Sequence, residues 1–152
     1  MPYQIQKLNQ ISGQLQGGKQ TFLNLVAREG KEKMREYVQE HWYGTYTPQD
    51  YMRTEEVLNS ISARFEGDVV VIYYDEYKIS AIPHLNEWGQ HIGFNDEAFM
   101  IAYIEQGVGG GVASNPRRGD EGANAVKRLR GWLANYITIA VQQAFGASVK
   151  VR

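Results

Sequence analysis

Cysteine is absent from this chain of 152 residues. Its absence excludes a disulfide-bonded scaffold, a zinc finger, an iron–sulfur site and a thiol nucleophile. A run of about eighteen apolar residues, which a membrane-spanning helix needs, is absent as well. The N-terminal stretch MPYQIQKLNQ also lacks the apolar segment of a signal peptide. We therefore expect a cytoplasmic setting, without secretion or membrane insertion.

An excess of one charge sign is also missing, because the formal net charge is only −1. The charges are nevertheless unevenly placed. Residues 1–44 hold six Lys or Arg and four Glu, a net charge of +2. Residues 45–115 hold three Lys or Arg and eleven Asp or Glu, a net charge of −8. Residues 116–152 hold seven Lys or Arg and two Asp or Glu, a net charge of +5. A subunit with faces of opposite sign suits head-to-tail or ring assembly. The alternative is that these charges only solvate the surface.

The first third of the chain has a helical pattern. Apolar residues spaced by three and four predict a short amphipathic helix within 3–16, which Gly17 and Gly18 end. A single apolar stripe then predicts a first long helix from 21 to about 42. Gly30 lies on that stripe, either because another backbone approaches closely or because it occupies a surface turn of no importance.

A β-hairpin is predicted next. The run 69–74 is apolar, aromatic and rich in β-branched residues, which is typical of a strand covered on both faces. Residues 57–65 carry apolar side chains at alternate positions, which would share one face of a strand. We interpret them as the partner strand, joined to 69–74 through residues 66–68. Residues 77–82 predict a third short strand. The preceding stretch, 43–53, is expected to be a tether whose tyrosines pack on the core or form a binding hot spot.

The last third combines helices with loops. Residues 97–106 favour a helix, with a strand as the alternative, and the glycine-rich stretch 107–122 predicts a long mobile loop. An uninterrupted apolar stripe over 123–145 predicts a second long helix, and 147–152 predicts an extended tail. We therefore expect one structural domain, 1–152, of α+β class. In it an antiparallel β-sheet packs against a long N-terminal helix and a long C-terminal helix, with a long Gly-rich loop between elements.

Three residues are candidate metal ligands, His84, Glu87 and His91, because they would align on one face of a helix. Such a site would make the chain a small metal-dependent hydrolase; the alternative is three ordinary residues in a loop or short irregular helix. No set of nucleophile, base and orienting group is visible. No Lys-Ser or Lys-Thr follows the glycines after position 107, so a phosphate loop is not predicted. We expect no catalysis, no cofactor and no metal.

Five cations fall within fourteen residues near the start of the second long helix: Arg117, Arg118, Lys127, Arg128 and Arg130. Lys127, Arg128 and Arg130 sit at the helix start, where cations oppose the helix dipole, which indicates an acidic neighbour for these three. They also allow a passing contact with DNA, although a dedicated DNA-binding domain is normally strongly basic.

A short motif carries a resemblance to a known family. It consists of Tyr51, Arg53, Thr54, Leu58, Asn59, Ser60 and Ile61. These residues resemble the Y-x-R-T-x-x-x-L-N-S-I stretch of small structural proteins of tailed bacteriophages, in the head-to-tail joining and tail-completion (neck) family. The glycine that this family usually has before the L-x-N-S-I segment is replaced here by Thr54-Glu55-Glu56. This departure leaves the subfamily open.

The resemblance implies a virion structural protein without catalysis, assembled in the host cytoplasm. It implies a homo-oligomeric ring, a hexamer or dodecamer, at the head–tail interface, where it would contact portal or connector proteins and tail-tube proteins. A tail-terminator ring is the alternative role. The family's order of long helix, tyrosine-bearing tether, antiparallel sheet, glycine-containing loop and C-terminal helix matches the order predicted here.

Subunit contacts are expected from the Gly-rich loop and the tail, because extended segments supply interface area without a large apolar patch. The candidate interface residues are Gly109, Gly110, Gly111, Asn115, Arg117, Arg118, Val149 and Val151.

Overall fold

A single helix, α1 (Pro2–His41), forms the longest element of the computed structural model, at 40 residues. The structure describes residues 2–45, 56–79, 84–85, 91–92, 97–106 and 122–146. The predicted long helix is confirmed, but the predicted break at Gly17 and Gly18 is wrong. A helix tolerates an interior glycine at a cost of about 0.5–1 kcal/mol. At Gly18 the missing side chain also makes room, because a Cβ there would meet the ring of Phe145.

The β-hairpin pairs β1 (Ile61–Glu66) with β2 (Val69–Tyr74) in antiparallel register. The loop between them is Gly67-Asp68, and Gly67 has a φ of 59°, which suits the first position of a two-residue hairpin loop. The strand predicted for residues 57–60 is wrong, because they belong to a helical turn, α2 (Glu56–Ser60). Both Val57 and Leu58 are buried. A strand would point these neighbours to opposite faces, whereas a helical turn buries both.

Two further expectations about the hairpin region are wrong. Strand β2 is not covered on both faces, because Val69 is 58% exposed and the rest of the strand is half-buried. Only one face of a two-stranded sheet lies against α1. The predicted third strand over 77–82 does not form at its start either, because Glu76–Lys78 is a 3-10 turn. Residues 80–82 lie outside the described residues.

The remaining described elements are a 3-10 turn (Tyr43–Thr45), two short strands and two helices. Strand β3 (His84–Leu85) pairs antiparallel with β4 (His91–Ile92). Helix α3 (Glu97–Gln106) confirms the helical interpretation over the strand alternative. Helix α4 (Ala125–Phe145) confirms the second long helix.

The apolar stripe of α4 is only partly buried. Leu129 and Ala140 are buried, whereas Val126 and Ile137 are exposed. The predicted apolar stripe is therefore covered by this chain at some positions and left exposed at others.

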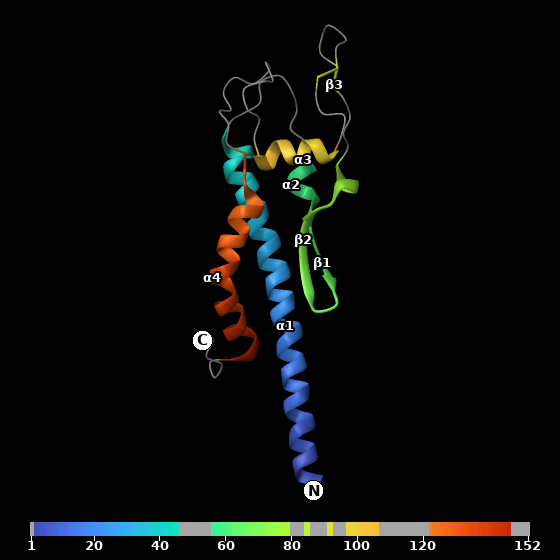
Figure 1. Ribbon diagram of the computed structural model, residues 1–152, viewed down its shortest axis with the longest axis vertical. Helices are drawn as coiled ribbons and strands as arrows, with labels where there is room; N and C mark the ends of the chain where they lie inside the picture. Colours follow the sequence, from blue (N-terminus) through green and yellow to red (C-terminus); the bar gives the residue numbers. More distant parts are fainter. Residues whose placement is uncertain are drawn as a thin grey trace.

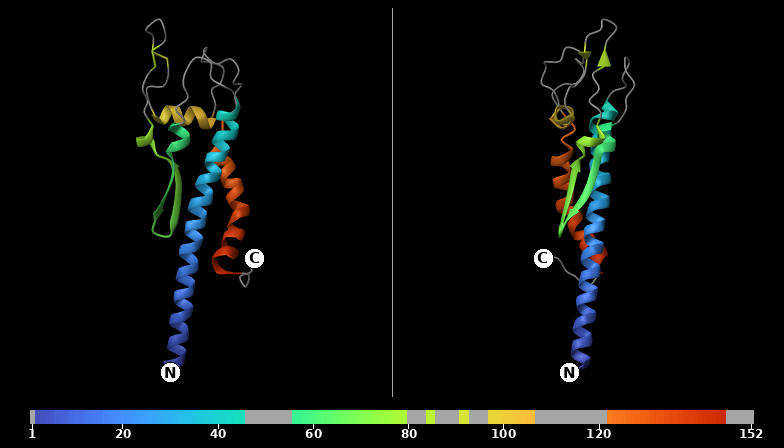
Figure 2. Two further views of the ribbon diagram at one scale, coloured as in Figure 1. Left: turned by 180° about the vertical axis from the view of Figure 1, so that it is seen from behind. Right: turned by 90° about the vertical axis from the view of Figure 1, so that its right-hand side faces the viewer.

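Helix α1 lies between two partners along its upper length (Figures 1 and 2). Helix α4 runs beside it on one side and the β1–β2 hairpin on the other, while α3 crosses near the end where α2 lies. Gly30 of α1 is buried, and a Cβ there would meet the side chain of Ile72 in β2. The lack of a side chain at Gly30 thus makes room for a neighbouring side chain and not for another backbone. A surface turn at Gly30 is excluded, because the residue is buried within a helix.

The core gathers where the C-terminal part of α1 meets α2, α3 and the start of α4. Its buried members are Met34, Val38, Trp42, Tyr43, Val57, Leu58, Ile61, Ile79, Ile104, Ala123, Ala125 and Leu129. The α+β class, with an antiparallel sheet against two long helices, is confirmed. Residues 107–121 of the Gly-rich loop and the tail 147–152 lie outside the described residues. Among the described helices, none has a segment apolar and long enough to span a bilayer.

A matched pair of glycine substitutions tests the continuous helix. No atom lies within 4 Å of a Cβ built at Gly17, so Gly17→Ala should stabilise the protein by about 0.5–1 kcal/mol through helix propensity. Gly18→Ala has the same propensity gain but must displace the ring of Phe145, so it should be less stable than Gly17→Ala. Urea unfolding followed by circular dichroism measures both. Equal effects at the two positions would contradict the packing of Phe145 on Gly18.

Candidate functional site

The described half of the sequence motif forms the junction between α2 and β1. Ser60 is fully buried, and its hydroxyl donates to the Val57 carbonyl at 2.7 Å. The Ser60 carbonyl accepts from the Asp75 amide and from the Ser62 hydroxyl, each at 3.0 Å. Ser60 therefore links the helical turn to both strands of the hairpin. Its neighbours in the motif, Leu58 and Ile61, are buried in the core.

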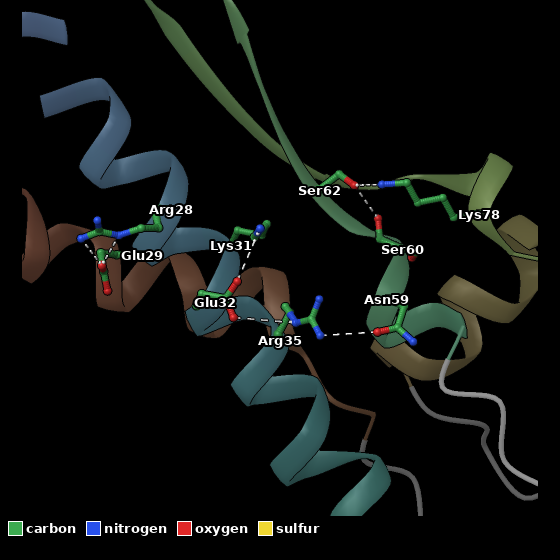
Figure 3. A network of polar contacts seen from close by, with 9 residues as sticks. All are labelled: Arg28, Glu29, Lys31, Glu32, Arg35, Asn59, Ser60, Ser62 and Lys78. Carbon is green, nitrogen blue, oxygen red and sulfur yellow. Dashed lines mark hydrogen bonds and ion pairs between the residues drawn. The ribbon is translucent and has the colours of Figure 1, made fainter. Parts of the chain in front are cut away.

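Asn59 is the exposed member of the motif. Its side-chain oxygen accepts a hydrogen bond of 3.4 Å from the guanidinium of Arg35 in α1 (Figure 3). The motif thus has two roles at adjacent positions, since Ser60 holds the junction inside and Asn59 faces a groove outside. Tyr51, Arg53 and Thr54 lie outside the described residues.

The groove beside Asn59 separates α1 from β1 and has a volume of about 580 Å³. Cations and apolar side chains line it together with a few neutral polar groups. The cations are Arg28, Lys31, Arg35 and Lys78, and the apolar residues are Ala27, Ile61, Ala63 and Phe65. We call it the basic groove. No carboxylate lines it among the described residues.

Local structure accounts for this lining. Arg28, Lys31 and Arg35 are three and four residues apart on α1, so they share one helix face. Ile61, Ala63 and Phe65 alternate along β1, so they share one sheet face. Because Ala63 is paired with Ile72, which packs on Gly30, that sheet face is the one turned toward α1.

The groove cations already have acidic partners outside the lining. Arg28 pairs with Glu29 at 2.7 Å, and Glu32 pairs with Lys31 at 3.5 Å and with Arg35 at 3.8 Å (Figure 3). Exposed ion pairs of this kind contribute about 0–1 kcal/mol each, because water and salt screen them. A carboxylate that arrives on a ligand can therefore replace them at little cost.

Lys78 closes one end of the groove. Its ammonium donates to the Ser62 hydroxyl at 2.8 Å (Figure 3). It also lies 3.5 Å from the Asp75 carboxylate. These contacts hold the lysine beside β1.

A second polar cluster joins three elements at the top of the molecule. The Glu105 carboxylate at the end of α3 accepts from the Tyr74 hydroxyl of β2 and, at 3.2 Å, from the Val126 amide of α4. A carboxylate at a helix N-terminus is favoured by the unpaired amides and the helix dipole. Burial raises the pKa of Tyr74 far above its ordinary value, and the nearby negative charge of Glu105 raises it further.

The cations at the start of α4 are not ion-paired within the described residues. The guanidinium of Arg128 donates to the Ala123 carbonyl at 3.0 Å, while the carboxylate near this helix start, Glu105, accepts from the Val126 amide. The expected acidic neighbour is thus present, but it bonds to the helix backbone. Arg117 and Arg118 lie outside the described residues.

The candidate metal ligands do not share a helix. His84 lies on β3 and His91 on β4, and Glu87 is outside the described residues. A shared helix face is therefore excluded for the two histidines. In the part of the chain that the structure describes, no group of three or more His, Asp and Glu is placed to hold a metal ion. The loop and tail candidates Gly109, Gly110, Gly111, Asn115, Val149 and Val151 also lie outside the described residues.

The sequence patterns did not predict the basic groove. The spacing of Arg28, Lys31 and Arg35 on one helix face was a visible signal, but the closeness of β1 to that face was not. Neither a protein-family model, nor a curated protein, nor a solved structure matches this chain.

Neighbouring motif positions should respond differently to substitution. Ser60→Ala removes a buried hydroxyl and its bond to the Val57 carbonyl, and should lower the free energy of unfolding by about 1–2 kcal/mol. Asn59→Ala removes only an exposed contact and should change it by less than about 0.5 kcal/mol. Thermal and urea unfolding provide the measurement. A larger loss for Asn59→Ala than for Ser60→Ala would refute the assigned roles.

Tyr74 should make stability depend on alkaline pH. Its pKa is raised on folding from an ordinary value of 10.0, so its contribution is fully present below pH 10 and is lost as pH rises above it. Tyr74→Phe should destabilise the protein near neutral pH by about 0.5–1.5 kcal/mol, and the gap to the parent should narrow above pH 10. Tyr77→Phe, at a fully exposed ring, is the matched control. Its free energy of unfolding should equal that of the parent both near neutral pH and above pH 10.

Proposed function

We propose that this chain is a structural protein of a tailed-phage virion, a subunit of a homo-oligomeric ring at the head–tail interface that acts by protein contacts. The observation that carries the proposal is the N-terminal end of α1, which continues beyond every other described element (Figure 1). A helix that projects with Leu15 exposed needs a partner, and a second copy supplies one.

The ends of both neighbours contact α1 at adjacent residues. The hairpin tip ends where Asp68 pairs with Lys19 at 2.5 Å, and α4 ends where Phe145 lies against Gly18. The helix before that level, 2–17, extends about 24 Å further at 1.5 Å per residue. Leu15 in this segment is 58% exposed.

The sequence of the projecting segment favours pairing with a like helix. Leu8, Ile11 and Leu15 recur at spacings of three and four, and the same spacing leads on to Gly18, which lies against Phe145 of α4. Lys7 is the only charged side chain between residues 2 and 18, so two copies would not repel each other strongly. A lone helix of this length is marginally stable in water, and association would stabilise it.

Several more apolar side chains are exposed near the same end of the molecule. Phe65 and Val69 flank the hairpin tip, and Ile137 and Ile139 lie in the C-terminal part of α4. Exposed apolar side chains on three elements fit a subunit that contacts more than one neighbour.

The phage assignment is supported by the motif and by the order of elements. A long helix, a hairpin that begins at the motif, and a long C-terminal helix occur in the order that the resemblance implies. The portal or connector, the tail-tube proteins and a passing contact with DNA are the partners proposed with this role. The loop 107–122 and the tail 147–152 are proposed as further contact segments.

One substitution tests assembly and function together. Leu15→Glu places a charge on the apolar stripe and should convert the assembled protein to smaller species, as measured by light scattering and native mass spectrometry. Gln16→Glu adds the same charge one residue away, off the stripe, and should leave the assembly intact. A parent protein that stays monomeric at tens of micromolar would refute the proposed ring.

The same variants report on the virion. In a phage genome with this gene inactivated, we expect filled heads and finished tails that are not joined. The parent gene and Gln16→Glu should restore joined particles, and Leu15→Glu should not. Normal virions without the gene product would disprove the head–tail role.

A further inference from the structure

Strand β1 has an edge with which no other described strand pairs, because β1–β2 is a two-stranded sheet. The Ser60 carbonyl accepts from the Asp75 amide at 3.0 Å, and this pair continues the register of the sheet. In an antiparallel ladder, residues bonded to the partner strand alternate with residues whose N–H and C=O point outward. The backbone groups of Ile61, Ala63 and Phe65 therefore point away from β2.

The basic groove runs along this edge. The sheet residues that line it are Ile61, Ser62, Ala63 and Phe65, all from β1, and none comes from β2. From residue 61 to 65 the strand spans about 13 Å at 3.3 Å per residue. On the opposite wall, α1 spans about 10 Å from Arg28 to Arg35. The two walls therefore match in length, as a bound extended segment requires.

The lining calls for a ligand that is both acidic and apolar. Among the described residues, four cations and no carboxylate line the groove, so it favours negative charge. Phe65 is 48% exposed and lies on the same sheet face as Ile61 and Ala63, so apolar side chains can also be covered there. An extended segment in which acidic and apolar side chains alternate offers both kinds of contact.

We propose that the basic groove binds an extended acidic segment of another protein, which pairs with the free edge of β1 as a third strand. The segment's backbone would bond to the outward N–H and C=O groups of Ala63 and Phe65, because Ile61 is only 3% exposed. Its carboxylates would meet Lys31 and Arg35. This mode of recognition combines main-chain hydrogen bonds for affinity with side-chain contacts for specificity. It is independent of the ring proposal, because the projecting end of α1 takes no part.

Two alternative roles for the groove fit its lining less well. A nucleic-acid backbone would satisfy the cations but would leave the apolar face and the outward backbone groups of β1 without partners. Lys and Arg beside an open edge can also serve only to prevent pairing with further strands. Each alternative predicts a different outcome from strand pairing when an acidic peptide is titrated with the protein.

The test is fluorescence anisotropy of a labelled synthetic peptide in which Val and Glu alternate, titrated with the full chain. We expect saturable binding that weakens as salt is raised. The double variant Lys31→Glu/Arg35→Glu should weaken it by about tenfold or more. Lys127→Glu/Arg130→Glu makes the same charge change on exposed residues of α4 and should change binding by less than about twofold.

Backbone pairing has its own control. Successive N–H groups of a strand point to opposite edges, so methylation of the Val amides and methylation of the Glu amides block different edges. One of these two peptides should lose binding and the other should keep it. In the protein, Ala63→Pro removes an outward N–H that the β1–β2 ladder does not use, and should weaken binding while the chain stays folded.

Several outcomes would overturn the proposal. These are equal binding of a peptide with Lys in place of Glu, equal binding of both methylated peptides, and binding of a single-stranded oligonucleotide at the groove without peptide binding. Self-association of the Lys31→Glu/Arg35→Glu variant, with no peptide binding by the parent, would show instead that the cations only protect the edge.

Discussion

The packing of one continuous helix against two unlike partners is the constraint on which the rest of the structure depends. Helix α1 accepts α4 on one side and the hairpin on the other. At two levels a glycine makes the approach possible, Gly18 for Phe145 and Gly30 for Ile72. Met34 and Val38, further along the helix, are almost completely buried in the core. A side chain at either glycine must displace its neighbour, so the two glycines position both partners.

This arrangement produces the two surfaces to which we assign roles. Because both partners end near residues 18 and 19, the earlier part of α1 is left as a projecting helix with an apolar stripe. Because the hairpin lies on α1 through one sheet face, the edge of β1 faces the side of the helix that carries Arg28, Lys31 and Arg35. The first surface suits contact between copies, and the second suits an acidic strand from a different protein.

Polar contacts fix the end of the molecule opposite the projecting helix. Glu105 joins β2 to the start of α4 through Tyr74 and Val126, and Ser60 joins α2 to the hairpin. The Ser60 hydroxyl is buried and the Tyr74–Glu105 pair is part-buried, and an unpaired polar group in such surroundings is costly. They hold the frame in which the groove and the projecting helix keep their positions.

Local patterns in the sequence determined the helices at 97–106 and 123–145, most of α1, and strand β2, because side-chain period and β-branching act over a few residues. Only the tertiary structure decided that α1 runs through Gly17 and Gly18, that 57–60 is helical, and that β2 is half exposed. It also brought Arg35 to Asn59 and Tyr74 to Glu105, across 24 and 31 residues. Such contacts leave no periodic signal, because they arise from how finished elements pack and not from the residues next to them.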